Sequence, residues 1–327
     1  MKRLAILAAI AGTCVIAGAI WAADPAAVAD AVARAGAATL LVIGVRAISM
    51  VGAGWAWWLL LPSKKAPHPR LCVLLRIVRE GGNTLLPFTQ VGGDVIGARL
   101  LTFWGIAGAL AAASVIVDIL LQAVTQFIFA LTALALLALR GSSHALVREL
   151  MAGFVVAVPA LAGFYVVQRR WGEALVRSLL RRLARGREWA VHGTAEALFQ
   201  NLHTIYERRG RLISALLVHL AVWFFGAMEV WISLSAIGHV VDYRSALIIE
   251  GLAQAVRGAA FMVPGAVGVQ EGGLIMLCGL FGIPAQSALA LSLIKRAADL
   301  AVGGPGLIAW QVLEASRIGK RKAPATK

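Results

Sequence analysis

Apolar residues fill most of the chain in long runs that short polar segments separate. Six of these runs are close to the roughly 20 residues that a helix needs to cross the hydrocarbon core of a membrane. The pattern therefore predicts an all-α integral membrane protein, a polytopic helical bundle with six full spans. The six predicted spans are residues 4–23, 37–61, 106–139, 150–168, 212–237 and 285–313.

Two further regions are apolar but interrupted, and neither is expected to form one straight helix. Residues 71–105 contain the string NTLLPFTQVGGD, and residues 245–283 contain the string RGAAFMVPGAVGVQEGG. Proline removes a backbone donor and clashes with the preceding turn, while clustered glycines weaken a helix. Both regions are predicted to be broken or re-entrant helices.

Composition supports a membrane protein and excludes several other classes. The 327 residues are 60% hydrophobic and 14% charged, whereas soluble domains are about half apolar and a quarter charged. The net charge of +15 does not fall on a soluble domain with interleaved aromatics, so no nucleic-acid binding is expected. The cysteines are isolated and the histidines form no ligand pair, so neither a disulfide, a metal site nor another cofactor is expected.

The first 23 residues also resemble a signal peptide, because a basic start precedes an apolar run. Cleavage after Ala23 would place the bulky Trp21 where a small residue is needed. We therefore interpret this segment as a retained first helix.

The distribution of basic residues predicts the topology. If both broken regions enter and leave on one side, the segments on the N-terminal side are 1–3, 62–80, 169–211 and 314–327. These segments hold 22 of the 31 Lys and Arg, against four in the loops of the other side. The positive-inside rule then predicts N-in, C-in. The two broken regions would enter from opposite faces, as in transporters built from inverted repeats.

A short pattern also suggests a weak repeat and divides the chain into two membrane halves. The predicted organisation is a first half at 1–168, a linker at 169–211 and a second half at 212–327. In each half an arginine precedes a proline, and an acidic residue follows that proline by seven positions. The two sets are Arg79, Pro87 and Asp94, and Arg257, Pro264 and Glu271.

The linker at 169–211 carries two apolar stripes at helical spacing, with arginines opposite the first. Basic amphipathic helices of this kind bind the anionic cytoplasmic leaflet, which is the predicted role. Docking of another protein is the alternative. The stripes are Leu175, Val176, Leu179, Leu180 and Leu183, followed by Ala195, Leu198, Phe199, Leu202 and Ile205.

Ionisable side chains at membrane depth cost about 2.5 to 3.5 kcal/mol each on insertion scales, so each one is a functional hypothesis. The alternative is that they pair and hold the bundle together, as Lys295 and Asp299 could at a spacing of four. His219 and Glu229 share one span and are interpreted as hydrogen-bonded interior residues rather than a proton relay. The full set is Arg46, Asp94, Arg99, Asp118, Glu229, Glu250, Arg257, Glu271, Lys295, Arg296 and Asp299.

The two broken regions concentrate the candidate chemistry. Backbone groups freed around Pro87 and around 264–268 are tolerated only where protein or a wet cavity surrounds them. Helix ends that point into such a cavity offer an anion site, and arginine can bind a phosphate in a bidentate manner. The predicted lining is Asn83, Asp94 and Arg99 from the first region, and Arg257, Glu271 and Arg296 from the second.

Two strings in these regions resemble a known protein family. The sequence N83-TLL-P87-FTQVGG-D94 with Arg99, and VPGAVGVQEGG with Arg296, resemble the membrane region of the lysylphosphatidylglycerol synthase family. The resemblance is closest to a branch associated with hopanoid biosynthesis and covers residues 4–314. It implies a bacterial inner-membrane protein that moves or hands over lipids. The matching residues are Asn83, Pro87, Asp94 and Arg99, and Pro264, Gly265, Gly268, Glu271 and Arg296.

Three functions remain open. The leading hypothesis is a translocase or handover protein for a hopanoid or a phospholipid. A membrane-embedded transferase with Asp94 or Glu271 as general base is the main alternative, but the chain shows no constellation that would bind a donor. A scaffold for lipid-biosynthetic enzymes is the third. No catalytic residue is assigned.

Overall fold

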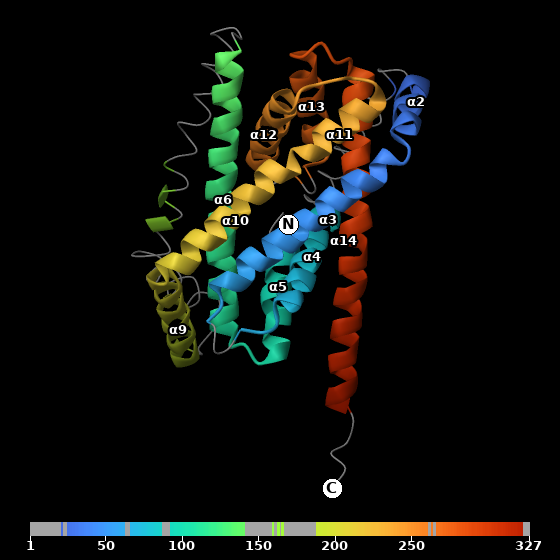
Figure 1. Ribbon diagram of the computed structural model, residues 1–327. Coiled ribbons are helices and arrows are strands. Elements are labelled where there is room, and N and C mark those ends of the chain that lie inside the picture. Colours follow the sequence, from blue (N-terminus) through green and yellow to red (C-terminus); the bar gives the residue numbers. More distant parts are fainter. Residues whose placement is uncertain are drawn as a thin grey trace.

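The computed structural model describes residues 25–62, 66–86, 92–140, 188–260 and 266–322, together with a few isolated positions. This part of the chain is helical, without strands. The predicted spans 4–23 and 150–168 lie outside it, apart from single positions. Figure 1 shows a bundle of long, mutually inclined helices.

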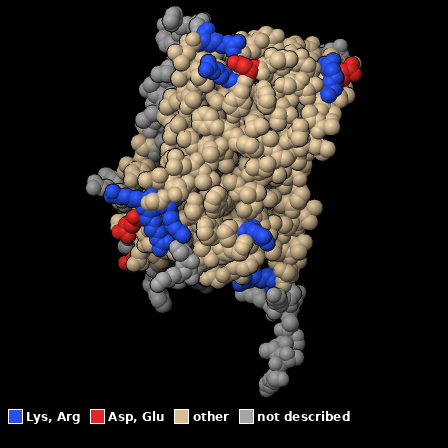
Figure 2. All heavy atoms as spheres, viewed as in Figure 1, with Lys and Arg blue, Asp and Glu red and all other residues tan. Residues whose placement is uncertain are grey.

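Three helical segments of the described part are long and apolar enough to cross a membrane. They are α3 (Ala38–Leu60), α6 (Gly108–Leu139) and the pair α10 (Arg209–Gly226) and α11 (Met228–Ile237), which a turn at Ala227 joins. Their positions match the predicted spans 37–61, 106–139 and 212–237. In Figure 2, a broad band without charged side chains separates charged groups at the two ends, as expected for a surface that faces lipid.

The C-terminal span forms part of a longer helix. Helix α14 runs from Ala285 to Lys322, past the predicted end at residue 313. It includes Pro305, which lies between glycines. A β-carbon added to Gly306 would lie 2.6 Å from the carbonyl oxygen of Ile77. One added to Gly303 would lie 3.0 Å from the Cα of Gly81. These glycines therefore let α14 approach α4 at backbone distance.

Both predicted broken regions form helical hairpins. The first hairpin is α4 (Pro69–Leu85) and α5 (Gly92–Leu101), followed by the short helix η1 (Thr102–Trp104). The second hairpin is α12 (Tyr243–Ala259) and α13 (Val269–Gly279). In Figure 1 the first lies in the lower half of the bundle and the second in the upper half. Which end faces the cytoplasm stays a prediction.

Glycine permits close contact within the first hairpin. A β-carbon on Gly93 would lie 2.0 Å from the carbonyl oxygen of Arg79 and 2.8 Å from the side-chain oxygen of Asn83. No side chain fits at such a distance, so α4 and α5 pack backbone against backbone. This contact places Asp94 directly opposite Arg79.

Two segments differ from their sequence interpretation. The predicted outer loop 24–36 contains a helix, α2 (Pro25–Ala35), because Val28, Ala31 and Ala35 form one buried apolar face. In the linker, α9 (Glu188–Glu207) packs its apolar stripe against α6 rather than presenting it to a leaflet. Leu202 and Ile205 of that stripe are buried in the protein core. The first stripe, at 175–183, lies outside the described residues.

Candidate functional site

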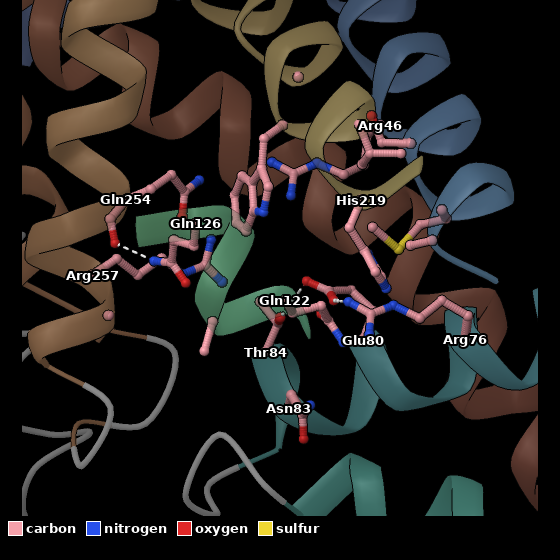
Figure 3. Close-up of a pocket in the computed structure, with 18 of the residues that line it drawn as sticks. Arg46, Arg76, Glu80, Asn83, Thr84, Gln122, Gln126, His219, Gln254 and Arg257 are labelled. Carbon is pink, nitrogen blue, oxygen red and sulfur yellow. Dashed lines mark hydrogen bonds and ion pairs between the residues drawn. The ribbon is translucent and has the colours of Figure 1, made fainter. Parts of the chain in front are cut away.

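A polar cavity of about 330 Å³ lies between the two hairpins. Helices α3, α6, α10 and α11 complete its wall. Figure 3 shows side chains from both hairpins directed toward this space. The uncharged polar lining consists of Ser49, Asn83, Thr84, Gln122, Gln126 and Gln254.

A buried polar group, which we call the Asp118 cluster, forms one wall and the layer behind it: Arg76, Glu80, Asp94 and His219 line the cavity, and Arg79 and Asp118 lie behind them. Arg79 is fully buried and contacts two carboxylates, with Nε 2.7 Å from Asp94 Oδ1 and Nη1 2.7 Å from Asp118 Oδ2. Its guanidinium also lies 4.7 Å from the centre of the Trp57 ring. Asp118 further contacts His219 Nε2 at 2.9 Å. The cluster thus joins α4, α5, α6 and α10.

Asn83 links the two helices of the first hairpin. Its amide nitrogen donates to Asp94 Oδ2 at 3.1 Å, and its side-chain oxygen accepts from the backbone N–H of Gly93 at 2.7 Å. Both oxygens of Asp94 therefore accept hydrogen bonds. The predicted pair of Asn83 and Asp94 is thus present, but its arginine partner is Arg79.

A second buried network, the Lys295 cluster, consists of Arg46, Glu229, Glu250, Lys295 and Asp299. Lys295 Nζ lies 2.9 Å from Glu250 and 3.1 Å from Glu229. Arg46 contacts Glu229 at 2.8 Å and Asp299 at 3.2 Å. The expected pairing of Lys295 with Asp299 is wrong. The lysine forms ion pairs with carboxylates from α11 and α12, and Asp299 forms one with Arg46 of α3.

Glu271 stabilises the start of α13. Its Oε2 accepts the backbone N–H of Gly268 at 2.7 Å, and its Oε1 accepts from Ser292 and Arg296 at 2.7 Å each. Gly268 has a φ of 83°, a left-handed conformation that favours glycine. Neither Glu271, Gly268 nor Arg296 lines the cavity. Glu271 and Asp94 thus lie in separate polar groups.

Arg257 also lines the cavity. It lies in the last turn of α12 and is half-buried. Among the described residues, no hydrogen bond or ion pair to its side chain is formed. Figure 3 shows it on the side of the cavity opposite Arg76 and Glu80. In this part of the chain, the other cavity arginines, Arg46 and Arg76, are engaged by carboxylates.

Arg99 does not contribute to the cavity as predicted. Its side chain is 65% exposed and its Nε lies 2.8 Å from Glu314 of α14. The hydrogen bonds from Arg99 hold the pKa of the Glu314 carboxyl below its usual value. Arg99 points outward because it lies on the face of α5 away from Asp94. Pro87 and Pro264, also predicted to be site residues, lie outside the described residues, as does Gly265.

Several cavity residues were missed by the sequence interpretation. Arg76 and Arg79 were counted with the cytoplasmic segment 62–80, but both are buried. The signal that could have found them is their spacing on α4, where positions 76, 79, 80 and 83 form one polar stripe in a helix. The glutamines of α6 carried no charge and gave no signal. Gln126 donates to the backbone oxygen of Gln254 at 2.6 Å and so links α6 to α12.

The site offers binding groups rather than reactive ones. Most of its charged groups, and its amides and hydroxyls, already have hydrogen-bond partners in the protein. Among the described residues, the guanidinium of Arg257 has none. No grouping of three metal-ligating His, Cys, Asp or Glu occurs within the described residues. The arrangement suits a polar ligand that carries a negative group.

Apolar helices around a polar cavity define this protein as a polytopic helical membrane protein. The family model "Lysylphosphatidylglycerol synthase TM region" matches residues 6–305. The chain belongs to this family of membrane proteins that act in lipid-related processes, as its motifs suggested. The comparisons with curated proteins and with solved structures gave no match.

Proposed function

We propose that this protein moves lipid head groups across the membrane or hands lipids over within it. The observation that carries the proposal is a polar cavity lined by Arg257, whose side chain has no hydrogen bond or ion pair among the described residues. The cavity lies inside a bundle with a broad uncharged band on the face shown in Figure 2. The barrier to lipid movement is the transfer of a polar head group through hydrocarbon, where unsatisfied polar groups cost several kcal/mol. A lined cavity lowers that barrier while the acyl chains stay in lipid.

The dimensions and the lining of the cavity support a head group as the ligand. Its volume of about 330 Å³ falls in the range of roughly 300 to 1,000 Å³ that is usual for small-ligand sites. Arg257 can bind a phosphate through two parallel hydrogen bonds. Each amide nitrogen of Gln122 and Gln126 has a second N–H besides the one that bonds Asp118 or Gln254, and this N–H can donate to hydroxyl or ester oxygens of the same head group.

The choice between a phospholipid and a hopanoid depends on Arg257. A neutral terpenoid lipid offers no anionic partner to the guanidinium of Arg257, whereas a phosphate does. We therefore propose a phosphate-bearing lipid, with a hopanoid as the alternative outcome. The bacterial cytoplasmic membrane and the N-in, C-in orientation belong to the same proposal and rest on the distribution of basic residues.

A transferase function is the second candidate and is less favoured. Its proposed general bases, Asp94 and Glu271, each accept hydrogen bonds from an arginine at 2.7 Å. In both carboxylates each oxygen already accepts a hydrogen bond from the protein, so no oxygen is left free to take a proton from a substrate. A role as a scaffold has no specific observation in its favour.

Lipid movement in proteoliposomes tests the proposal. Purified protein is reconstituted with fluorescent phosphatidylglycerol, and dithionite quenching measures how fast the label leaves the protected leaflet. We expect transfer by the wild type and a loss of at least about tenfold in Arg257→Gln, the size of one charge-assisted bidentate contact. Arg244→Gln is the matched control, because Arg244 is exposed at the other end of α12. Equal rates in all three proteins contradict an arginine-dependent head-group site.

A further inference from the structure

With His219 neutral, the formal charges of the Asp118 cluster sum to one excess negative charge. It contains two arginines, Arg76 and Arg79, against three carboxylates, Glu80, Asp94 and Asp118. All six members, including His219, have at most partial exposure, and Asp118 is fully buried. An isolated net charge in a membrane interior is costly. One bound proton would make the cluster neutral.

His219 is the member placed to hold that proton. Its ring is 2% exposed, and its Nε2 lies 2.9 Å from Asp118 Oδ1. The ring lines the cavity, whereas Asp118 lies behind it and does not. A neutral imidazole that donates Nε2–H to Asp118 leaves Nδ1 unprotonated, and within the described residues Nδ1 makes no hydrogen bond. A proton from the cavity can therefore bind at Nδ1 while the contact with Asp118 is kept.

The charged groups around His219 favour this arrangement. Asp118 on α6 is in direct contact, and Arg76 and Arg79 of α4 lie beyond it. On α3 and α11, which pack against α10, Arg46 and Glu229 contact each other. On α9, His203 and Glu207 form an exposed pair, and α10 itself carries Arg209 and Arg211 at its start. Asp118 is therefore the charged group in direct contact with the imidazole.

We propose that His219 is the proton-binding site of this protein and that proton binding is linked to capture of the anionic head group. This inference rests on the proposed function. A proton on His219 removes the net negative charge of the Asp118 cluster, which otherwise repels a phosphate entering the cavity. By linkage, each ligand then raises the affinity for the other. Loss of the proton releases the lipid, so a pH gradient drives net movement.

A binding experiment tests the linkage without transport. Dihexanoylphosphatidylglycerol, a short-chain soluble lipid, is titrated into the detergent-solubilised full chain in buffers that differ in ionisation enthalpy. The slope of the observed heat against that enthalpy is the number of protons taken up per lipid bound. We expect uptake of a substantial fraction of one proton in the wild type and none in His219→Gln. If His219→Gln folds poorly, Asp118→Asn is the second variant. It removes the excess negative charge and is also expected to abolish proton uptake.

A transport experiment then tests the consequence. Transfer of fluorescent phosphatidylglycerol is measured in phosphatidylcholine proteoliposomes with the lipid-donating side acidic, and again after nigericin collapses the gradient. In the wild type we expect the transfer rate with the gradient to be about fivefold the rate without it, which is the lower end of the usual range of coupling between two ligands. In His219→Gln the two rates should be equal. His203→Gln is the control, because His203 is 67% exposed on α9, and it should keep the wild-type ratio.

The outcomes separate the two proposals. Transfer without any response to the gradient, together with binding without proton uptake, overturns the proton site and leaves lipid movement standing. A response that persists in His219→Gln overturns the assignment to His219. Absence of both lipid binding and transfer in the wild type overturns the proposed function and the linkage with it. Proton-linked binding without transfer supports the proton site in a lipid-binding protein that does not translocate.

Discussion

The carboxylate of Asp94 accepts a hydrogen bond of 2.7 Å from Arg79, its partner across the first hairpin. The corresponding pair of the second hairpin, Arg257 and Glu271, is not formed. Glu271 is bound by Arg296 of α14 instead, and Arg257 has no partner among the described residues at the cavity. The two similar motifs thus differ in their contacts: Arg79 is bound within the fold, whereas Arg257 is the residue that we propose binds a ligand.

The first prediction concerns this difference. Arg79→Gln should lower the stability of the detergent-solubilised protein strongly, because it leaves Asp94 and Asp118 buried without their cation. Breaking a buried ion pair costs about 3 to 5 kcal/mol in soluble proteins. Arg257→Gln should melt within a few degrees of the wild type. Thermal unfolding followed by intrinsic fluorescence compares the two, and equal melting temperatures contradict the distinction.

The second prediction concerns the Lys295 cluster. Lys295→Met should destabilise the protein, since Glu250 and Glu229 lose a cation in the interior. Adding Glu250→Gln should restore part of the stability, because the unpaired charge is removed. A double-mutant cycle on melting temperatures measures the coupling. Independent effects of the two substitutions are the result that contradicts a direct ion pair.

The third prediction concerns the glycines of α14. Gly306→Ala places a β-carbon 2.6 Å from the carbonyl oxygen of Ile77, so α14 and α4 must separate. Overpacking of this kind costs typically about 1 to 3 kcal/mol. Gly304→Ala is the matched control, because a β-carbon there meets nothing within 4 Å. The melting temperature should fall in the first variant only, and a fall in both would show a general loss of backbone flexibility.

The fourth prediction concerns topology. In a background without native cysteines, Ser142→Cys in the predicted outer loop 140–149 should react with an impermeant maleimide added to intact cells. Glu207→Cys, at an exposed position of α9, should react only after permeabilisation. Ser142 itself lies outside the described residues. Labelling with the opposite pattern reverses the orientation and the assignment of each hairpin to a face.

Much of the fold could be predicted, because hydropathy and chain breaks are local properties. Runs of apolar residues marked α3, α6 and the α10 and α11 pair, and proline with clustered glycine marked both hairpins. The stripe of α9 was misread because an apolar face looks the same whether it contacts lipid or α6. Helix α2 was missed because its 11 residues are too short to span a membrane.

The pairing of charges was the part that could not be predicted. Lys295 and Asp299 have the right spacing on one helix, but the carboxylates of Glu229 and Glu250 reach the lysine from other helices. Arg99 lies in the same short segment as Asp94, but its side chain points outward and contacts Glu314. Partners of this kind depend on the rotation of each helix about its axis, which only tertiary packing fixes.

Helix α14 contacts both hairpins. Through Arg296 it holds Glu271 of the second hairpin, and through Gly303 and Gly306 it lies against α4 of the first. A shift of either hairpin along the membrane normal must therefore break one of these contacts or carry the other hairpin with it. Opening of the cavity toward one leaflet and closure toward the other would then occur together, because α14 couples the two hairpins.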